Sequence, residues 1–272
     1  MGNNTPLFRI MPLERFLELL YTRQNVLVRP TLWNDPYESI IEKSAMMSNP
    51  DTLELYDITR WYGQCWSCKP ESDALWRVFS NGAVVRSVKI KTTVEAIKNQ
   101  LAEDDIIKDF ILLKVKYADY AYKKKDVRKK LAETFQFGWE FSYDCLDLNS
   151  QIDNDPQMRA AYMLLTKRNQ FNFEEEVRLL AYCHQPQEEK VYKYPIHDLG
   201  SFIHEVVIDP WAPDELVDTL RDIVRHYIPA TNIPVTKSDL YEKQYSGFLY
   251  DPHKWYDDWY QKRMLSPGTN KV

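Results

Sequence analysis

Three consecutive glutamates precede an apolar run in the segment Phe171 to Cys183. Side chains alternate between the two faces of a strand. If this segment is a strand, Glu174, Glu176 and Arg178 share one face, about 7 Å apart in succession. Two carboxylates so placed suit a reaction in which one stabilises positive charge in the transition state and the other removes a proton from a nucleophile. Arg178 would keep both carboxylates ionised through charge-assisted hydrogen bonds.

The same three side chains also have a purely structural interpretation. Glutamates and an arginine that alternate along a strand can form its solvated face, where they pair across the edge of the sheet with a neighbouring strand. The sequence does not distinguish a functional carboxylate pair from a solvated edge strand, so both interpretations remain open.

Motifs for metal binding and for nucleophilic catalysis give weaker signals. Cys65 and Cys68 have the spacing of half a zinc site, and Cys183 with His184 would be the other half. Trp66 lies between the first two within a strand pattern that has no turn residues, which favours small buried cysteines. The sequence has no G-x-S-x-G elbow, no P-loop and no G-x-G-x-x-G fingerprint. We therefore predict no metal site and no phosphate-binding glycine loop.

Composition and charge narrow the class of protein. The chain has 272 residues, of which 44% are hydrophobic and 28% charged, a balance typical of globular proteins. Its 18 tyrosines and 8 tryptophans can line a pocket for a planar ligand. The net charge of −5 disfavours a broad nucleic-acid surface. The basic segment Tyr122 to Lys130 is either a solvated helix face or a site that steers an acidic partner.

Targeting and membrane signals are not evident in the sequence. The N-terminal residues lack a basic segment followed by an apolar run, and no window approaches 18 apolar residues. The four cysteines form no evident disulfide framework. We expect a cytoplasmic location and no membrane partner.

The apolar periodicity predicts an α+β fold. We expect one domain over residues 1–237, with a mixed or split β-sheet core flanked by helices. A helical insertion is predicted at about 120–169, and a peripheral tail at 238–272. The predicted helices cover 12–24, 34–47, 71–82, 92–104 and 212–227, and the predicted strands cover 25–33, 61–69, 83–90, 106–119, 171–183, 191–196 and 203–210.

Three segments follow one another along the chain: Asn34-Asp35-Pro36-Tyr37-Glu38, Cys65 to Gly82 with its aromatic-Ser strand and Trp-bearing helix, and Glu174-x-Glu176-x-Arg178. Taken together, they resemble the bacterial domain of unknown function 2971. A helix-capping turn alone would explain Asn34 and Asp35, but it does not require the aromatic-Glu pair that follows. The resemblance covers about Phe8 to Val217, and the chain departs from it at Phe79, where the family commonly has tyrosine. It departs again at Arg9–Ile10, where a Lys-Tyr pair is common.

A looser resemblance, to mono-ADP-ribosyltransferases, implies an activity. Those enzymes have a basic residue on the first strand, an aromatic-Ser strand and a late Glu-x-Glu strand. By position, the resemblance implies that Arg9 contacts the phosphates or ribose of NAD and that Ser67 supports the nicotinamide side. Glu176 would hold the ribose 2′-hydroxyl and stabilise the oxocarbenium ion, and Glu174 would orient an acceptor. NAD is then a substrate, and the chemistry needs no metal.

Further side chains are predicted to complete the NAD site. Trp33, Tyr37, Trp66 and Trp76 would stack on the nicotinamide or adenine ring. The predicted NAD-binding residues are Arg9, Asn34, Asp35, Tyr37, Ser67, Trp76 and Arg178, beside the catalytic pair Glu174 and Glu176.

Three functions remain open at the level of sequence. The first is an ADP-ribosyltransferase that uses NAD to modify a protein or a nucleic acid, as expected by analogy for a toxin or a phage-defence effector. The second is a Mg²⁺-dependent nuclease, with Asp35, Glu174 and Glu176 as ligands and Lys167 or the basic segment as the cation. The third is a non-catalytic module that binds a nucleotide. The acceptor and the oligomeric state are not predicted.

Overall fold

The computed structural model describes residues 1–35, 38, 45–49, 52–55, 58–80, 86–118, 161, 164–185, 187–229 and 232–242. Contacts divide the chain into two units, Met1–Leu240 and Tyr241–Val272, and the helices and strands below belong to the first. Several predictions fall outside the described residues: the tail beyond 242, most of the insertion with its basic segment, and most of the helix predicted at 34–47.

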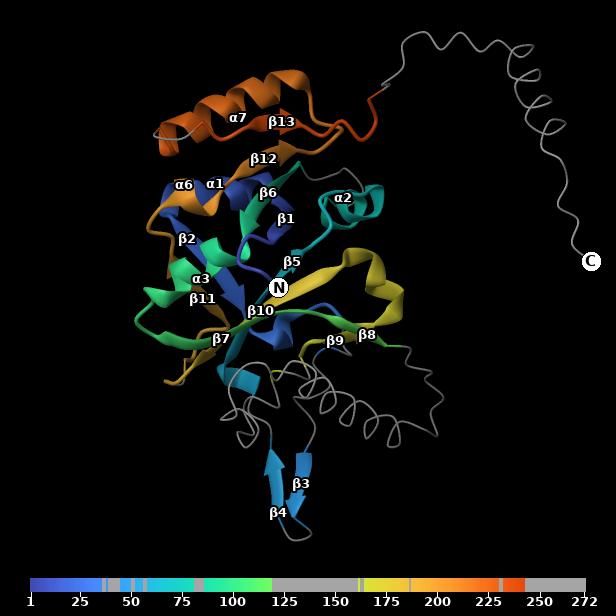
Figure 1. Cartoon of the computed structure of the whole chain (residues 1–272), viewed down its shortest axis with the longest axis vertical. Coiled ribbons are helices and arrows are strands. Elements are labelled where there is room, and N and C mark those ends of the chain that lie inside the picture. The colour runs from blue at the N-terminus through green and yellow to red at the C-terminus, as the bar shows by residue number, and fades with distance from the viewer. Residues whose placement is uncertain are drawn as a thin grey trace, which may run out of the picture. The chain divides into compact units, whose positions relative to one another are not determined.

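A nine-stranded mixed sheet forms the centre of the first unit (Figure 1). Its strands are β1 (Pro6–Pro12), β2 (Gln24–Val28), β5 (Trp61–Ser67), β6 (Ser87–Thr93), β7 (Ile107–Lys114), β10 (Glu176–Cys183), β11 (Val191–Pro195), β12 (Glu205–Ile208) and β13 (Val235–Lys237). Seven of them lie in the order β11-β2-β5-β1-β6-β12-β13, and β10 pairs with β5 and β7. All pairs are antiparallel except β12 with β13. The predicted α+β fold with a mixed sheet is therefore confirmed.

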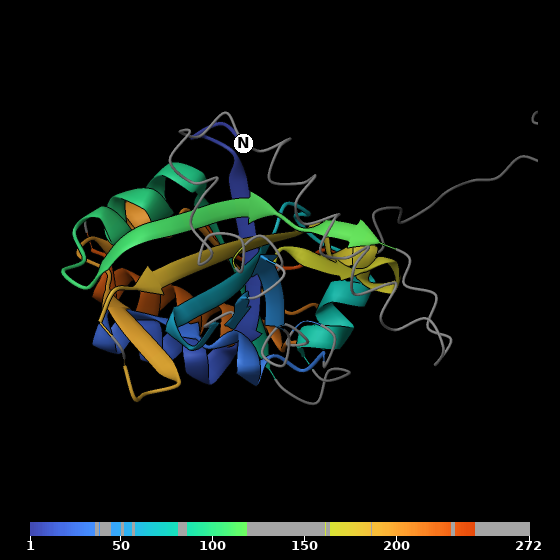
Figure 2. The same cartoon turned by 90° about the horizontal axis from the view of Figure 1, so that it is seen from below.

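The sheet divides at β5. One edge of β5 pairs with β10 along its length, from Trp61 opposite Tyr182 to Ser67 opposite Glu176. The other edge meets β2 at Gly63 and β1 at Ser67. The strands β1 and β2 therefore contact β5 at two separate points. Figure 2 shows β7, β10 and β5 side by side, in green, yellow and teal.

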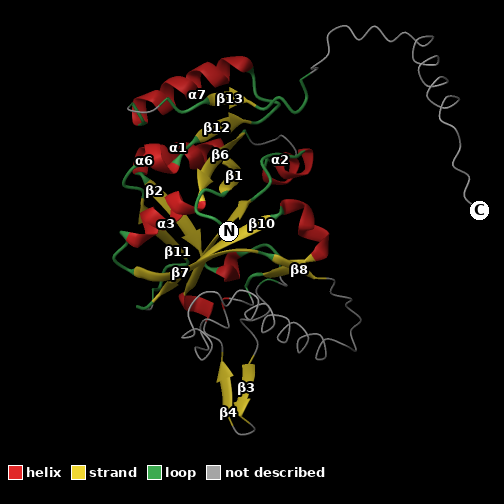
Figure 3. Ribbon diagram, in the orientation of Figure 1, coloured by secondary structure: helices red, strands yellow, loops and turns green. Residues whose placement is uncertain are grey.

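Five helices accompany the sheet in the described part of the chain (Figure 3). They are α1 (Leu13–Thr22), α2 (Asp73–Phe79), α3 (Val94–Ala102), α6 (Leu199–Phe202) and α7 (Asp214–Tyr227). Ser72 and Thr93 cap α2 and α3 by accepting hydrogen bonds from backbone N–H groups of the first turn. In α7, acids in the first turn and basic residues in the last turn complement the helix dipole. No helix among the described residues has the length and apolarity to cross a membrane.

Strand β10 is buried on both faces. Val177 and Leu179 belong to the main hydrophobic core, together with side chains of α1, α3 and α7. Leu180 lies on the opposite face and packs into a smaller cluster that contains Trp61 and Leu164. Even-numbered residues of β10 share that second face. Any charged side chain there lies inside the protein, where it needs a partner.

Several predicted elements are wrong in part. The strand predicted at 25–33 ends at Val28, because Pro30–Leu32 form a 3₁₀ helix. The strand predicted from residue 171 begins at Glu176, because Asn169–Glu174 form a 3₁₀ helix that ends at Glu175 in the left-handed region, with φ of 44°. The helical insertion was predicted to include Thr166–Arg168, but these residues form a strand, β9, which pairs in parallel with β8 (Lys116–Ala118). The last residues of the helix predicted at 34–47 belong to a strand instead, because β3 (Ala45–Asn49) pairs with β4 (Thr52–Leu55). At β9 and β3, pairing with another strand overrides local periodicity.

Candidate functional site

A cavity of about 690 Å³ lies where β1 and β2 diverge along β5. Arg9 of β1, Trp66 and Ser67 of β5, and the acids Glu174 and Glu176 contribute to its wall. Six of the side chains predicted for the site therefore line one cavity, although they come from four parts of the sequence: Arg9, Trp33, Trp66, Ser67, Glu174 and Glu176. Its volume falls in the range typical of small-molecule and cofactor sites.

Glu176 opens β10, and Arg178 holds its carboxylate from inside the protein. Arg178 has no exposed surface, and Glu176 is 3% exposed. The guanidinium contacts both carboxylate oxygens, with Nε 2.6 Å from Oε1 and Nη2 3.2 Å from Oε2. The ring of Trp33 lies over the guanidinium, with its centroid 4.3 Å from Cζ. The interpretation of this face as a solvated edge strand is therefore wrong, because β10 lies between β5 and β7 and its charges are buried.

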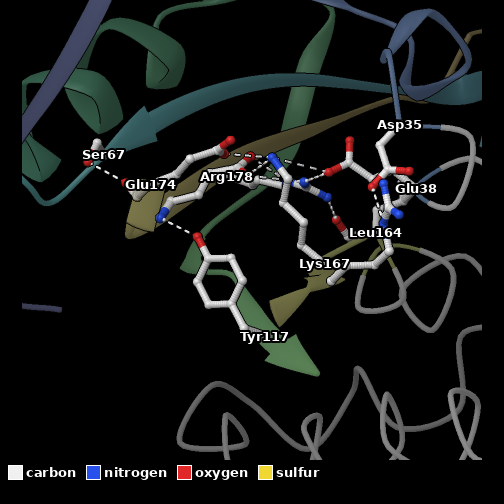
Figure 4. A network of polar contacts seen from close by, with 10 residues as sticks. Asp35, Glu38, Ser67, Tyr117, Leu164, Lys167, Glu174 and Arg178 are labelled. Carbon is white, nitrogen blue, oxygen red and sulfur yellow. Dashed lines mark hydrogen bonds and ion pairs between the residues drawn. The ribbon is translucent and has the colours of Figure 1, made fainter. Parts of the chain in front are cut away.

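Lys167 of β9 joins Glu176 to two other carboxylates (Figure 4). Its Nζ lies 2.6 Å from Oε2 of Glu174, 3.0 Å from Oε2 of Glu176 and 3.4 Å from Oε1 of Glu38. Glu38 also receives a hydrogen bond of 2.6 Å from Nη2 of Arg178. Three carboxylates and two cations thus form one buried cluster, which we call the ion cluster: Glu38, Lys167, Glu174, Glu176 and Arg178.

The two cavity acids of the ion cluster differ in their electrostatics. Burial raises the pKa of Glu176, but Arg178 and Lys167 outweigh burial and lower it to about 2. Burial raises the pKa of Glu174, and its pairing with Lys167 does not cancel that effect. Glu176 is therefore a fixed anion at neutral pH, whereas Glu174 gains a proton more readily than an ordinary glutamate.

Glu174 reaches Glu176 through a turn, and not through strand alternation as predicted. It ends the 3₁₀ helix, and one residue with left-handed backbone, Glu175, separates it from the start of β10. Ser67 fixes this turn, because its Oγ donates a hydrogen bond of 2.6 Å to the Glu174 carbonyl oxygen. The backbone N–H of Glu176 donates to the hydroxyl of Tyr117 at 2.8 Å. The acids are thus held together by backbone contacts on both sides.

A second polar network surrounds Arg9 in the same cavity, and it contains only neutral groups besides that arginine. The amides of Asn25 and Gln64 face each other, with Gln64 Nε2 donating to Asn25 Oδ1 at 2.7 Å. Tyr194 contacts Asn25 Nδ2 at 2.7 Å, and Trp66 Nε1 donates to Gln64 Oε1 at 2.8 Å. Arg9 Nη1 donates to Asn25 Oδ1 at 3.4 Å. We call these five side chains the amide network.

Arg9 has no ion-pair partner among the described residues. Burial lowers the pKa of its guanidinium, as expected for a cation that is partly removed from water without a carboxylate beside it. The cavity therefore has an unneutralised positive charge at Arg9 and the carboxylates of the ion cluster at another part of its wall.

The remaining predicted residues lie elsewhere. Asn34 is exposed, and Asp35 pairs with Arg168, whose Nε lies 3.1 Å from its Oδ2. Trp76 is fully buried, and its Nε1 donates to Glu71 at 2.5 Å, so it is not part of the cavity wall. Tyr37 lies outside the described residues. The functional roles of the predicted residues stay predictions.

Sequence reasoning assigned no role to Glu38 and considered Lys167 only as a nuclease cation. Glu38 stands in the Asn34–Glu38 turn, and the aromatic-Glu pair that capping did not explain was its signal. Lys167 and Tyr117 had no comparable signal, because the contacts that bring them to β10 come from β8 and β9.

Metal ligands do not gather in the described part of the chain. Among those residues, no group of three or more His, Cys, Asp or Glu side chains is placed to hold a metal ion. The ligands predicted for a Mg²⁺ site have cationic partners instead: Asp35 pairs with Arg168, and Glu174 with Lys167. These carboxylates are arranged to bind protein cations.

No family model matches the sequence, and no curated protein matches it. The resemblance to domain of unknown function 2971 therefore stays a prediction. Solved structures of Thermus sp. 2.9 DarT are similar at TM-scores of 0.37, 0.36 and 0.37 and identities of 10%, 11% and 11%, in complexes with carba-NAD+, NAD+ and ADP-ribosylated ssDNA respectively. They cover 88%, 87% and 88% of this chain and 97%, 96% and 96% of those chains. TM-scores this low carry no argument about activity.

Proposed function

We propose that the chain binds NAD in the cavity between β1 and β2 and transfers ADP-ribose to a protein or nucleic-acid acceptor. One observation carries the proposal: a single cavity wall holds the cation Arg9, which has no ion-pair partner among the described residues, and the fixed anion Glu176. NAD has the matching charges, a negative diphosphate and a nicotinamide ribose that becomes positive as its bond to nicotinamide breaks.

The ion cluster suits the bond-breaking step. When the bond between ribose C1′ and the nicotinamide nitrogen breaks, its electron pair leaves with nicotinamide and the ribose becomes an oxocarbenium ion. The carboxylate of Glu176 stabilises that charge, and it is already oriented by Arg178 and Lys167. Such preorganised electrostatic stabilisation acts more strongly in the transition state than in the ground state.

Glu174 suits the second half of the reaction. The acceptor nucleophile forms a new bond to C1′ and loses a proton, and a nearby base must take it. Glu174 lines the same cavity, and its raised pKa makes it a better base than an ordinary glutamate. If water replaces the acceptor, the same steps produce free ADP-ribose.

Nicotinamide release and acceptor labelling by purified protein test this function. NAD labelled on the adenine is incubated with the protein in EDTA, together with single-stranded DNA, RNA or a protein extract. Glu176→Gln should lower nicotinamide release by about a thousandfold, while NAD still binds, because its loss removes stabilisation of the transition state. The matched control is Glu175→Gln, the adjacent exposed glutamate outside the cavity wall, which should keep the wild-type rate.

The possible outcomes separate the three functions considered for this chain. NAD binding without turnover for any acceptor would indicate a nucleotide-binding module. Nucleic-acid cleavage that needs a divalent cation and disappears in EDTA would indicate a nuclease. Equal rates for wild type and Glu176→Gln would remove Glu176 from the reaction.

A role as a toxin or phage-defence effector is part of the same proposal. Its test is induced expression in a bacterial host, where wild type should arrest growth or phage propagation and Glu176→Gln should not. Equal growth curves for the two proteins, at equal protein levels, would contradict this role without affecting the proposed chemistry.

A further inference from the structure

We infer that Glu38 is a positioning residue that fixes Arg178 and, through it, the Glu176 carboxylate in the cavity wall. The kinetic consequence of this inference rests on the proposed function, whereas its structural consequence does not. Glu38 contacts both cations of the ion cluster, yet it is not part of the cavity wall. Any effect of Glu38 on a ligand in the cavity must therefore pass through another side chain.

The hydrogen bonds of Arg178 show how that effect is transmitted. Nε and Nη2 hold the two oxygens of Glu176, and Nη1 donates to the carbonyl oxygen of Leu164. Nη2 also donates to Glu38, at 2.6 Å. A guanidinium presents its donors in one rigid plane. Losing the acceptor at Glu38 therefore lets the whole plane tilt, and the carboxylate bound to Nε and Nη2 moves with it.

Glu38 is itself held in place by contacts that do not involve Arg178. Its backbone N–H donates to the carbonyl oxygen of Asp35 at 3.0 Å, and Asp35 pairs with Arg168 of β9. The carboxylate is 9% or less exposed, so water competes little for its hydrogen bonds. A buried anchor of this kind can constrain a partner that lies 140 residues away in the sequence.

Charge balance gives Glu38 a second effect on the site. With all groups ionised, three carboxylates face two cations, so the ion cluster has one negative charge in excess. Removing Glu38 balances the charges, and Lys167 then shares its attraction between Glu174 and Glu176 alone. Glu176 would become less able to stabilise a positive ribose.

Two substitutions test the inference through the rate of nicotinamide release. Glu38→Ala removes the acceptor, and Glu38→Gln keeps an acceptor oxygen while removing the charge. We expect Glu38→Ala to lower kcat about a hundredfold and Glu38→Gln about tenfold, since displacing a reacting group by about 1 Å can cost a hundredfold in rate. The dissociation constant for NAD should stay within about threefold, and Glu175→Gln is the matched control.

A merely structural role would give a different pattern. It would lower the melting temperature and the fraction of active protein, with KM, the NAD dissociation constant and kcat per active site unchanged. Unchanged kcat in correctly folded Glu38→Ala and Glu38→Gln would overturn the inference.

Crystal structures of wild type and Glu38→Ala make the test independent of activity. We expect the Arg178 guanidinium and the Glu176 carboxylate to shift together in the variant. If Glu38→Ala does not fold, the structure of Glu38→Gln is compared with the wild type instead. Unmoved side chains would overturn the inference even if the rate falls. A wild type without turnover, combined with a shifted carboxylate, would overturn the proposed function and support the positioning role.

Discussion

Two polar networks border the cavity, and they differ in how their buried charges are compensated. The ion cluster consists of charged groups that neutralise one another, and each of its cations has at least two carboxylate partners. The amide network consists of neutral groups around one cation, and among the described residues it supplies Arg9 with one hydrogen bond but no opposite charge. The ion cluster thus places carboxylates in the cavity wall that are already paired with cations, whereas the amide network places there a cation that has no opposite charge beside it among the described residues.

This difference predicts different consequences of mutation. Removing a member of a buried ion pair leaves an uncompensated charge in a region of low dielectric constant, which is strongly destabilising. Removing a neutral amide leaves an unsatisfied hydrogen-bonding group, which costs less. The ion cluster should therefore dominate stability, while the amide network should matter chiefly for the ligand that Arg9 contacts.

The largest expected effect comes from Arg178→Leu. It leaves Glu38 and Glu176 buried without their guanidinium, and we expect the free energy of unfolding to fall by about 3–5 kcal/mol. Gln64→Leu, the comparison in the amide network, should cost about 1–3 kcal/mol. Urea denaturation followed by circular dichroism measures both. Equal losses would mean that the charged and neutral networks do not differ in the way described.

The pH dependence of stability separates the two acids within the ion cluster. Glu176 has a folded-state pKa of about 2, below its ordinary value of 4.5, so its contribution is present above pH 4.5 and is lost as pH falls towards 2. That shift corresponds to at most about 3 kcal/mol. The raised pKa of Glu174 has the opposite sign, so acidification just above pH 4.5 should increase stability.

Urea denaturation from neutral pH down to about pH 2 tests both signs. The stability difference between wild type and Glu176→Gln should shrink as the pH falls from 4.5 towards 2, because the unfolded wild-type chain then binds a proton at Glu176 that the folded protein does not. The difference between wild type and Glu174→Gln should change at higher pH and in the opposite direction. Differences that stay constant over the whole pH range would contradict the assigned pKa shifts.

Gly63→Ala should have a smaller effect, at the point where β5 meets the ring above Arg178. A Cβ at this position would lie 2.6 Å from Cζ2 of Trp33, which is too close for the ring to stay in place. We expect a loss of about 1–3 kcal/mol from overpacking, together with a reduced rate of nicotinamide release. Gly2→Ala is the control, because its added Cβ meets only Thr5 Oγ1 at 4.0 Å. Full activity in Gly63→Ala would show that Trp33 need not lie over Arg178.

Local sequence pattern was sufficient to predict one part of the site. Glu176 and Arg178 lie on one face because residues two apart on a strand always do, and β10 is a strand from Glu176 onward. Glu174 could not be placed in this way, since a left-handed residue at Glu175 is not signalled by a glutamate. The contact of Glu38 with Arg178 could not be predicted either, because it joins positions 140 residues apart.

The same limit applies to the fold. Strong apolar periodicity predicted β5 and α7, which lie within the predicted ranges. The short strands β9 and β13 have three residues each and exist through parallel pairing with β8 and β12. Three residues are too few for periodicity to indicate a strand. Burial of β10 on both faces could not be predicted either, because it depends on the two hydrophobic clusters that pack against those faces.

The smallest expected effect concerns the cation of the amide network. Arg9→Gln removes a positive charge that has no carboxylate partner among the described residues, so the free energy of unfolding should change little. Binding of NAD should weaken about tenfold, because a charge-assisted contact to phosphate is lost. The salt dependence of binding should weaken with it. Isothermal titration calorimetry at two salt concentrations measures both, with Arg225→Gln on the exposed surface of α7 as the control. A large loss of stability in Arg9→Gln, with NAD affinity unchanged, would reverse the comparison, because Arg9 would then hold the fold together in the way that Arg178 does.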